Sequence, residues 1–410
     1  MTDNPLTING TTLVSCEKDA WGDIKIPDGV KCIGNSAFSD CEKIDSVEIP
    51  DSVTKIESWA FCDCKNLTRV RLPHNNSLVM EDAIFLNCKE IAEIEIPNGV
   101  KVVTYGMFEG CKWLERISLP DSVTEIDHFA FKDCYRLTDV QLSRNLKMIN
   151  SSSFEDCKSI VQLDLPDGLL KIEAYAFFGC TGLSTLTIPN SLKKIEDAAF
   201  ASCPNLNHLV IADDHPAYRF KDGMLYTKDY RMLKACLLPP VKSITIPDGV
   251  VRIGASTFEN CTTLTEVHIP DGVKEIGAGA FKCCYHLADI RIPKGVTKVE
   301  SGAFSFCECI DHIELPNSLT TIGEDAFKRC DSFISIRIPN SVTKIESWFL
   351  SFCEQLKEIH FERKGLKSVR WNEEMLKGVD KEKCTIFVPK GTEEMYRAHP
   401  AFEGYVIVEE

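Results

Sequence analysis

The sequence lacks an excess of basic residues and has no long apolar segment. It contains 46 Lys and Arg residues against 61 Asp and Glu residues, which gives a formal net charge of −15. A chain of this charge does not have the basic footprint of a nucleic-acid binder, and an anionic membrane surface would repel it. No apolar run approaches the length that spans a bilayer. We therefore expect no nucleic-acid partner and no membrane insertion.

The sequence motifs of common enzyme classes are also missing. There is no G-x-x-x-x-G-K-[ST] phosphate loop, no H-E-x-x-H zinc motif and no G-x-S-x-G nucleophile elbow. No C-x-x-C pair occurs among the 20 cysteines, so the usual spacing of zinc ligands is absent. The sequence predicts no enzymatic activity, no catalytic residue, no metal site and no cofactor.

The first residues, MTDNPLTING, contain neither a basic segment nor the apolar core of a secretory signal. As written, the sequence favours a cytoplasmic protein. Many cysteines without a signal also favour a reducing compartment, although only weakly.

The sequence does contain a unit of 23 residues that recurs along almost the whole chain. In each unit a proline follows a short apolar run, a phenylalanine comes later, and a cysteine follows three residues after the phenylalanine. The phenylalanine column consists of Phe38, Phe61, Phe85, Phe108, Phe131, Phe154, Phe177, Phe200, Phe258, Phe281, Phe304 and Phe327, with Leu350 in the last place. Such periodicity is typical of a repeat protein.

The alternating run before each proline predicts a short strand that is buried on one face. In one unit Val267 and Ile269 would point inward, while Glu266 and His268 would point outward. The Asp-Gly, Asp-Ser or Asn-Ser pair after the proline then turns the chain. One coil cannot bury its apolar set alone, so stacked coils are required. The pattern predicts a solenoid with a parallel sheet along one side.

The unit L-x-x-V-x-I-P-x-x-V-x-x-I-x-x-x-A-F-x-x-C resembles the leucine-rich repeat of the BspA-like type. This resemblance covers almost the whole chain. It implies an α/β repeat fold: a leucine-rich-repeat solenoid with a parallel β-sheet on the concave side, a mostly irregular or short-helical convex side, and caps at both ends. Relatives on microbial surfaces imply a role in adhesion or host interaction. A cell-surface or secreted location is therefore the alternative to the cytoplasm.

Breaks in the period predict the domain organisation. An Asn9-Gly10 pair near the start favours a hairpin turn, and alternating runs around Asp222-Gly223 favour a second hairpin. The predicted segments are an N-terminal β-hairpin cap (1–23), a first repeat block (24–211), a β-hairpin insert (212–243), a second repeat block (244–361) and a C-terminal cap (362–410).

The cysteine column indicates core packing. Thirteen cysteines follow the phenylalanines at the repeat period, and we expect them to be reduced thiols that fill the core. The other seven are Cys16, Cys32, Cys62, Cys236, Cys283, Cys309 and Cys384. Three of these lie close to a column cysteine, which we interpret as chance adjacency.

The outward strand positions vary from unit to unit, whereas the core columns stay constant. Any solvated sheet face is polar, yet such faces are the usual recognition surfaces of curved solenoids. We expect a polar protein-binding contact on the later part of this face. The candidate binding residues are Glu266, His268, Asp289, Arg291, His312, Glu314, Arg337 and His360.

A second set of candidates is aromatic. Trp59, Phe129, Tyr175 and Trp348 share the position two residues before the phenylalanine column. These side chains either form an exposed aromatic patch or lie partly buried between coils. The sequence indicates neither the partner nor the oligomeric state.

The favoured hypothesis is a non-enzymatic module that binds a protein. The alternative is a cytoplasmic scaffold or a rigid structural spacer. A spacer would tolerate charge changes along the outward strand positions, whereas a binding surface would not.

Overall fold

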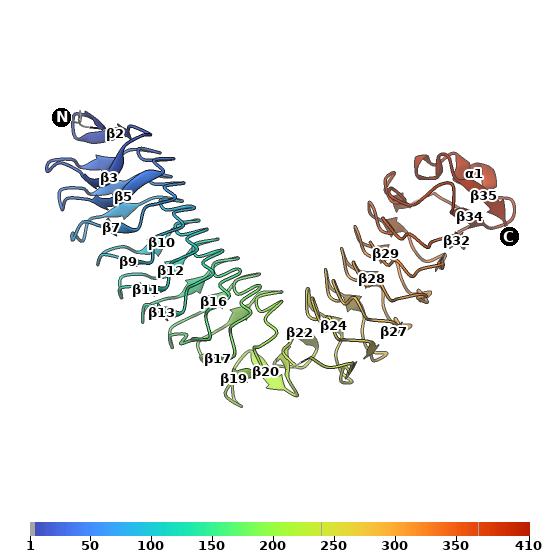
Figure 1. Cartoon of the computed structure of the whole chain (residues 1–410). Coiled ribbons are helices and arrows are strands. Elements are labelled where there is room, and N and C mark those ends of the chain that lie inside the picture. Colours follow the sequence, from blue (N-terminus) through green and yellow to red (C-terminus); the bar gives the residue numbers. More distant parts are fainter. Residues whose placement is uncertain (1–4, 239, 368) are drawn as a thin grey trace. The chain divides into compact units, whose positions relative to one another are not determined.

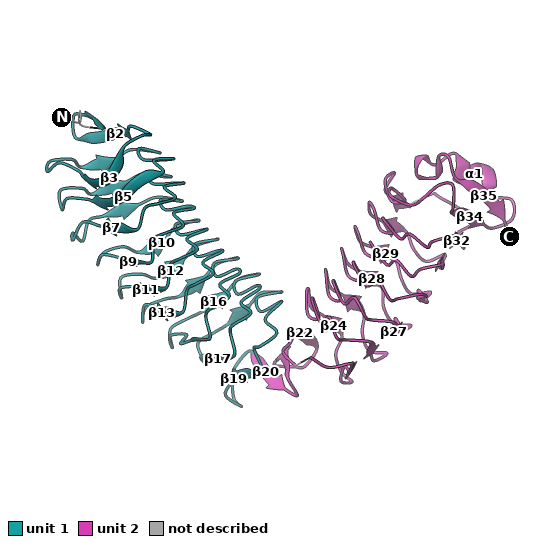
Figure 2. Ribbon diagram, in the orientation of Figure 1, with its two compact units in different colours: residues 1–217 teal, residues 218–410 magenta. Residues whose placement is uncertain are grey.

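The computed structural model describes residues 5–238, 240–367 and 369–410. The chain forms two compact units, unit 1 (Met1–Ala217) and unit 2 (Tyr218–Glu410), which Figure 2 colours separately. The boundary between them lies inside the predicted 212–243 insert.

Unit 1 is a stack of coils with two rows of parallel strands, which we call ladders (Figure 1). Among the described residues, the first ladder is divided into three sheets and the second into two. The first ladder contains β3 (Trp21–Lys25), β5 (Lys43–Glu48), β7 (Arg69–Arg71), β9 (Glu93–Glu95), β11 (Arg116–Ser118), β13 (Asp139–Gln141), β15 (Gln162–Leu163), β17 (Thr185–Thr187) and β19 (His208–Val210). The second ladder contains the two-residue strands β4 (Cys32–Ile33), β6 (Lys55–Ile56), β8 (Val79–Met80), β10 (Val102–Val103), β12 (Glu125–Ile126), β14 (Met148–Ile149), β16 (Lys171–Ile172) and β18 (Lys194–Ile195).

Unit 2 repeats this arrangement. Its first ladder contains β23 (Ser243–Thr245), β25 (Glu266–His268), β27 (Asp289–Ile290), β30 (Ser335–Ile338), β32 (Glu358–Phe361), β34 (Thr385–Val388) and β35 (Val406–Glu409). Its second ladder contains β24 (Arg252–Ile253), β26 (Glu275–Ile276), β28 (Lys298–Val299), β29 (Thr321–Ile322), β31 (Lys344–Ile345) and β33 (Arg370–Trp371). The first ladder corresponds to the predicted sheet, whereas the second ladder was not predicted.

One part of the expected first ladder is missing. Residues His312 and Glu314 were expected at outward strand positions, but they lie in the segment between β28 and β29, which contains no strand. The ladder of unit 2 is therefore divided into the sheets β23-β25-β27 and β30-β32-β34-β35. The imidazole of His312 bonds locally, with Nδ1 at 2.7 Å from the Asp311 carboxylate.

A six-residue turn segment around each phenylalanine forms the third side of a coil, which we call the turn side. Its backbone N–H groups donate to carbonyls of the next coil, as from Phe38 to Ala60 at 2.7 Å and from Asp40 to Cys62 at 2.9 Å. The residues two before and two after each phenylalanine have positive φ, 55° at Ser36 and 58° at Asp40. Because these positive-φ residues are separated by residues of ordinary φ, the N–H groups of the turn point along the stack. The backbone hydrogen-bonding groups are thereby paired between coils without a helix.

The core consists of the phenylalanine and cysteine columns. Neighbouring phenylalanine rings stack at 4.8 Å for Phe38 and Phe61, and at 5.8 Å for Phe177 and Phe200. The Cys203 thiol donates to the Phe177 carbonyl oxygen at 3.0 Å, and burial raises its pKa to about 12. All 20 cysteines are free thiols, which confirms the prediction of a reduced core.

Both units begin with a β-hairpin whose last strand joins the second ladder. In unit 1, β1 (Leu6–Asn9) pairs antiparallel with β2 (Thr12–Cys16), which runs parallel to β4. In unit 2, β20 (Tyr218–Lys221), β21 (Met224–Thr227) and β22 (Met232–Cys236) form an antiparallel group, and β22 runs parallel to β24. The first hairpin turns at Gly10-Thr11 rather than at Asn9-Gly10, because Asn9 pairs with Thr12.

The end of unit 2 contains the helices of the described chain, α1 (Glu393–Arg397) and the 3-10 helix η1 (Pro400–Phe402). Aromatic rings close the core beneath them, with the Phe361 ring at 5.1 Å from Trp371 and 5.3 Å from Phe402. The described repeats have no helix. A leucine-rich-repeat solenoid with parallel strands and an irregular turn side, as predicted, is therefore confirmed.

Candidate functional site

The outward side chains of the first ladder form a surface that we call the strand face. In unit 2, Glu266 and His268 project from β25, and Asp289 projects from β27 in register with Glu266. All three are exposed. Among the described residues, none forms a hydrogen bond or ion pair with these three side chains. They are therefore available for a partner without breaking an internal contact.

Two further candidates continue this group. Arg291 lies one residue beyond the end of β27, and its guanidinium is 3.8 Å from the Asp271 carboxylate. Both side chains are largely exposed, at 62% and 79%, so this ion pair stabilises the fold little. Glu314 is also exposed, in the segment where the ladder is broken. His312 pairs with Asp311, and this hydrogen bond lowers the pKa of the Asp311 carboxyl.

The last two candidates are used inside the chain. The Arg337 guanidinium lies 3.2 Å from the Glu410 carboxylate, and His360 Nδ1 lies 3.0 Å from the same group. The His360 imidazole is only 14% exposed and stacks on Phe387 at 4.6 Å. The hydrogen bond between the His360 side chain and the Glu410 carboxylate holds the pKa of Glu410 below its usual range. Arg337 and His360 thus fasten the C-terminal strand, and a partner would compete with Glu410 for them.

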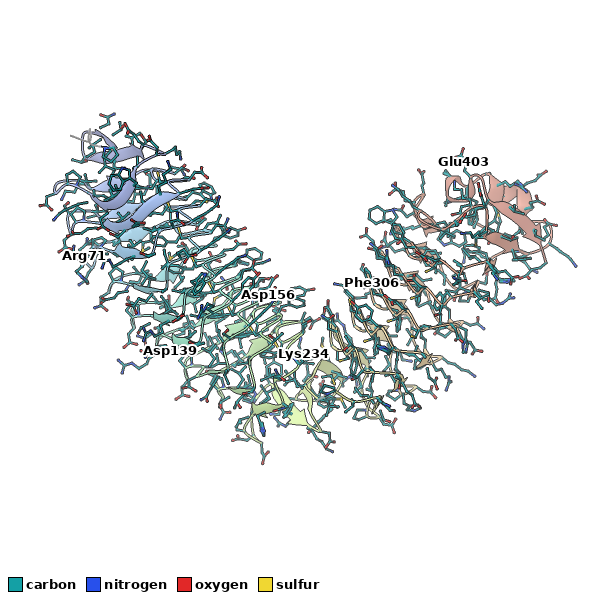
Figure 3. All side chains as sticks on the ribbon, in the orientation of Figure 1. Arg71, Asp139, Asp156, Lys234, Phe306 and Glu403 are labelled. Atoms are coloured by element: carbon teal, nitrogen blue, oxygen red, sulfur yellow. The ribbon has the colours of Figure 1, made fainter. Side chains whose placement is uncertain are left out.

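Aromatic residues on the turn side form a second surface. At the position two before the phenylalanine column, Trp59 is 46% exposed and Tyr175 is 41% exposed, while Phe129 and Trp348 are half-buried. Both interpretations of this set, as a patch and as partly buried rings, therefore apply to different members. Phe306 (Figure 3), Arg329 and Phe352 occupy the position two residues after the phenylalanine column in successive coils. The Arg329 guanidinium lies 5.9 Å from the ring centres of both Phe306 and Phe352.

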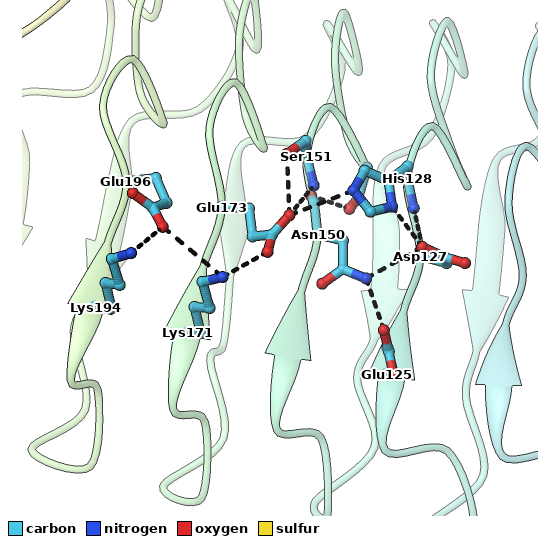
Figure 4. A network of polar contacts seen from close by, with 10 residues as sticks. Glu125, Asp127, His128, Asn150, Ser151, Lys171, Glu173, Lys194 and Glu196 are labelled. Atoms are coloured by element: carbon cyan, nitrogen blue, oxygen red, sulfur yellow. Dashed lines mark hydrogen bonds and ion pairs between the residues drawn. The ribbon is translucent and has the colours of Figure 1, made fainter.

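A polar network follows the second ladder of unit 1 (Figure 4). The Lys171 ammonium lies 2.6 Å from the Glu173 carboxylate, which also accepts from the Ser151 N–H of the preceding coil at 3.2 Å. Burial tends to raise the pKa of Glu173, but the hydrogen bonds from Lys171 and Ser151 lower it overall. His128 contacts Asp127 at 2.6 Å and Glu173 at 3.4 Å. This network joins coils and is structural.

Sequence reasoning did not identify that network. Its signal is the triplet Lys-Ile-Glu, which occurs at 55–57, 171–173, 194–196 and 344–346. In each triplet the lysine and the glutamate lie on one side of a two-residue strand and pair, at 2.9 Å for Lys55 and Glu57.

In the described part of the chain, no group of three or more His, Cys, Asp or Glu residues has the arrangement of a metal site. None of the described helices is long and apolar enough to cross a membrane. The candidate binding surfaces are thus the strand face, with its exposed charged side chains, and the turn side, with its exposed aromatic side chains.

The constant coil and its variable outward residues match a known family. The model of the BspA type leucine rich repeat region, with six copies, matches residues 15–138, 106–222 and 236–357. The chain belongs to this family. No curated protein gives a significant match to the chain.

Solved structures of bacterial proteins are similar to this BspA-type chain. A leucine-rich cell surface protein from Faecalibacterium prausnitzii is 30% identical, with a TM-score of 0.67 over 90% of this chain and 97% of that chain. A leucine-rich repeat protein from Bacteroides ovatus is 23% identical, with a TM-score of 0.52 over 100% and 99%. The pneumococcal vaccine antigen PcpA is 20% identical, with a TM-score of 0.59 over 100% and 98%. The last two similarities show the fold alone.

Proposed function

We propose that this BspA-type repeat protein is a non-enzymatic module that binds a protein partner through the strand face of unit 2. The contact is centred on Glu266, His268, Asp289 and Arg291. The observation that carries this proposal is the exposure of these four side chains, which lie on two adjacent strands and, for Arg291, one residue beyond the second. Three of them have no partner among the described residues. Binding there breaks at most one exposed ion pair.

The chemistry of this group favours a polar and specific contact. Two carboxylates, Glu266 and Asp289, lie in register on neighbouring strands, and Arg291 follows on the same strand side as Asp289. Mixed charges of this kind select a partner with the complementary arrangement and reject others. The partner therefore presents basic groups opposite the two carboxylates and an acidic group opposite Arg291.

The setting of the contact is proposed from similarity. The Faecalibacterium prausnitzii relative is described as a cell surface protein. We infer the same setting for this chain, with adhesion or host interaction as its role. A cytoplasmic scaffold or a rigid spacer is the competing function, and it predicts that the strand face tolerates charge changes.

The test is a charge swap that leaves the net charge unchanged. Asp289→Lys with Arg291→Glu reverses the proposed contact. Arg69→Glu with Asp139→Lys makes the matched change on the strand face of unit 1, where Asp139 (Figure 3) and Arg69 are exposed. Affinity capture from lysate and surface fractions of the native host compares both variants with the unchanged protein. Arg337 is left intact because it fastens Glu410.

We expect a partner that the unchanged protein and the unit 1 variant retain and that the unit 2 variant loses at least tenfold. Equal retention by all three folded proteins would contradict the proposed contact. Tolerance of both swaps, with no partner in either fraction, is the result that the spacer function predicts.

A further inference from the structure

The turn side contains aromatic residues at a backbone position that disfavours them. Trp59, Phe129, Tyr175 and Trp348 have φ values of 56° to 58°, in the left-handed region. A residue with a Cβ costs roughly 1–2 kcal/mol there relative to glycine. Other coils place small residues such as Ser36, or glycine, at this position. The fold therefore does not need the rings, and bulky residues under such strain often mark functional sites.

Two of these rings already hold a cation. The Lys132 ammonium lies 5.3 Å from the centre of the Phe129 ring and 2.9 Å from the Glu155 carboxylate. The Lys377 ammonium lies 5.6 Å from the Trp348 ring and 2.7 Å from the Glu374 carboxylate. In both cases one ammonium group contacts an aromatic ring and a carboxylate. This combination is the usual chemistry of cation recognition by proteins.

Trp59 shares the backbone setting of Trp348, but among the described residues no cation lies over its ring. The backbone N–H of Trp59 donates to the Asp82 backbone carbonyl at 2.9 Å, as the backbone N–H of Trp348 donates to the Glu374 backbone carbonyl at 3.0 Å. Among the described residues, no lysine or arginine lies over the Trp59 ring or pairs with the Asp82 carboxylate. Trp59 is 46% exposed, and Asp82 is exposed beside it. Burial is the main cause that raises the pKa of Asp82, with smaller contributions from the charges of Asp127 and Glu81, while a hydrogen bond from the Tyr105 backbone N–H acts in the opposite direction.

The reason for the missing cation is visible in the sequence. Lys132 comes three residues after Phe129, and the residue three after Trp59 is Cys62. The same position holds Lys282 and Lys328 in unit 2, so a lysine is compatible with the coil. The chain therefore supplies its own lysine to the Phe129 ring but supplies none to the Trp59 ring.

We propose that Trp59 and Asp82 form a binding site on the turn side of unit 1 for a lysine or arginine side chain of a partner protein. The ring supplies the cation–π contact and the carboxylate supplies the ion pair. This site is separate from the strand face of unit 2 and does not depend on the function proposed for that face.

The test uses heptalysine as the probe and fully acetylated heptalysine as the control, with affinities from titration calorimetry on the full chain. Trp59→Gly removes the ring and relieves the backbone, so the folded state is retained. Asp82→Asn removes the carboxylate. Cys62→Lys adds an internal lysine at the position that Lys132 occupies near Phe129. Asp167→Asn removes an exposed carboxylate elsewhere in unit 1 and is the matched charge control.

We expect Trp59→Gly and Cys62→Lys each to weaken heptalysine binding about fivefold, and Asp82→Asn about threefold, which corresponds to the range of one exposed cation–π contact and one ion pair. Asp167→Asn should change the affinity less than twofold. Equal affinity of Trp59→Gly, Cys62→Lys and the unchanged protein would overturn the site. Equal binding of the acetylated peptide would overturn it as well.

Discussion

The two units share their coil and differ on the turn side. Both begin with a hairpin that joins the second ladder, and both bury the same phenylalanine and cysteine columns. At the position two after the phenylalanine, unit 1 mostly uses residues that accept positive φ, whereas unit 2 mostly uses residues that do not. The residues of unit 1 are Asp40, Asp63, Asn87, Gly110, Asp133, Asp156, Gly179 and Ser202; those of unit 2 are Asn260, Cys283, Phe306, Arg329 and Phe352.

The stack of coils, and not the residue type, therefore imposes the backbone conformation. The φ value is 58° at Asp63 and 61° at Phe352, although only the first residue type favours it. The carbonyls of the next coil fix each turn, as in the bond from the Phe352 N–H to the Gly378 carbonyl at 3.1 Å. Unit 2 is therefore free to place large side chains on this surface at a modest cost in stability.

The largest expected effect is alkaline unfolding. Burial raises the pKa of Cys203 in unit 1 and of Cys353 in unit 2 to about 12, above the value near 8.5 of an unfolded thiol. The unfolded chain therefore loses these protons first, and stability falls as the pH rises from about 8.5 to about 12, by about 1.4 kcal/mol per pH unit for each thiol. Unit 1 has more column cysteines than unit 2, so it should unfold at the lower pH.

Hydrogen exchange followed by mass spectrometry resolves the two units in the full chain. Loss of protection in peptides of unit 1 before those of unit 2 is the expected order. Stability that is constant or rises between pH 9 and 11 would contradict the thiol explanation.

The next effect is local core damage. Phe131→Ala in unit 1 and Phe281→Ala in unit 2 each remove a fully buried ring and should cost about 3–5 kcal/mol of unfolding free energy. Because a coil contacts only its neighbours, each change should destabilise its own unit. Chemical denaturation with hydrogen exchange as the readout measures this directly. Equal loss of protection in both units from either variant would show that the units unfold together.

The smallest effect tests the turn side itself. Gly110→Ala in unit 1 should cost about 1–2 kcal/mol, because the glycine has a φ of 74° and a Cβ there would clash with the Asn87 side-chain oxygen. Cys283→Asn in unit 2 should stabilise by about 0.5 kcal/mol, since asparagine tolerates its φ of 58°. Denaturation midpoints measure both. A stabilising Gly110→Ala would refute the idea that the backbone conformation is imposed.

Much of the fold could be predicted because the core is periodic. The phenylalanine and cysteine columns fix which side chains point inward, and the alternation around Val267 predicts the strand. The second ladder could not be predicted in this way, since strands as short as Lys55–Ile56 have no alternation to detect. The positive-φ position had a visible signal in unit 1, where Asp, Asn and Gly dominate, but bulky residues obscure it in unit 2.

The candidate site was harder to predict because exposure does not reveal partners. Glu266 and His360 both occupy outward strand positions in the sequence pattern, yet only Glu266 is open in the structure. The contact that uses His360 comes from Glu410, 50 residues later and outside the repeats. Likewise, Cys16 lies outside the cysteine column by spacing, but its backbone carbonyl oxygen accepts a hydrogen bond from the thiol of Cys41, the first cysteine of that column, at 3.9 Å.

The strand face of unit 2 is the proposed recognition surface, and it can be probed in place. The most direct measurement is photocrosslinking in the native host with benzoylphenylalanine placed at position 289 in unit 2 or at position 139 in unit 1. Both positions are exposed outward sites on the first ladder. We expect a discrete crosslinked protein from position 289 and none from position 139. Crosslinks from position 139 alone, or from neither position, would contradict this expectation.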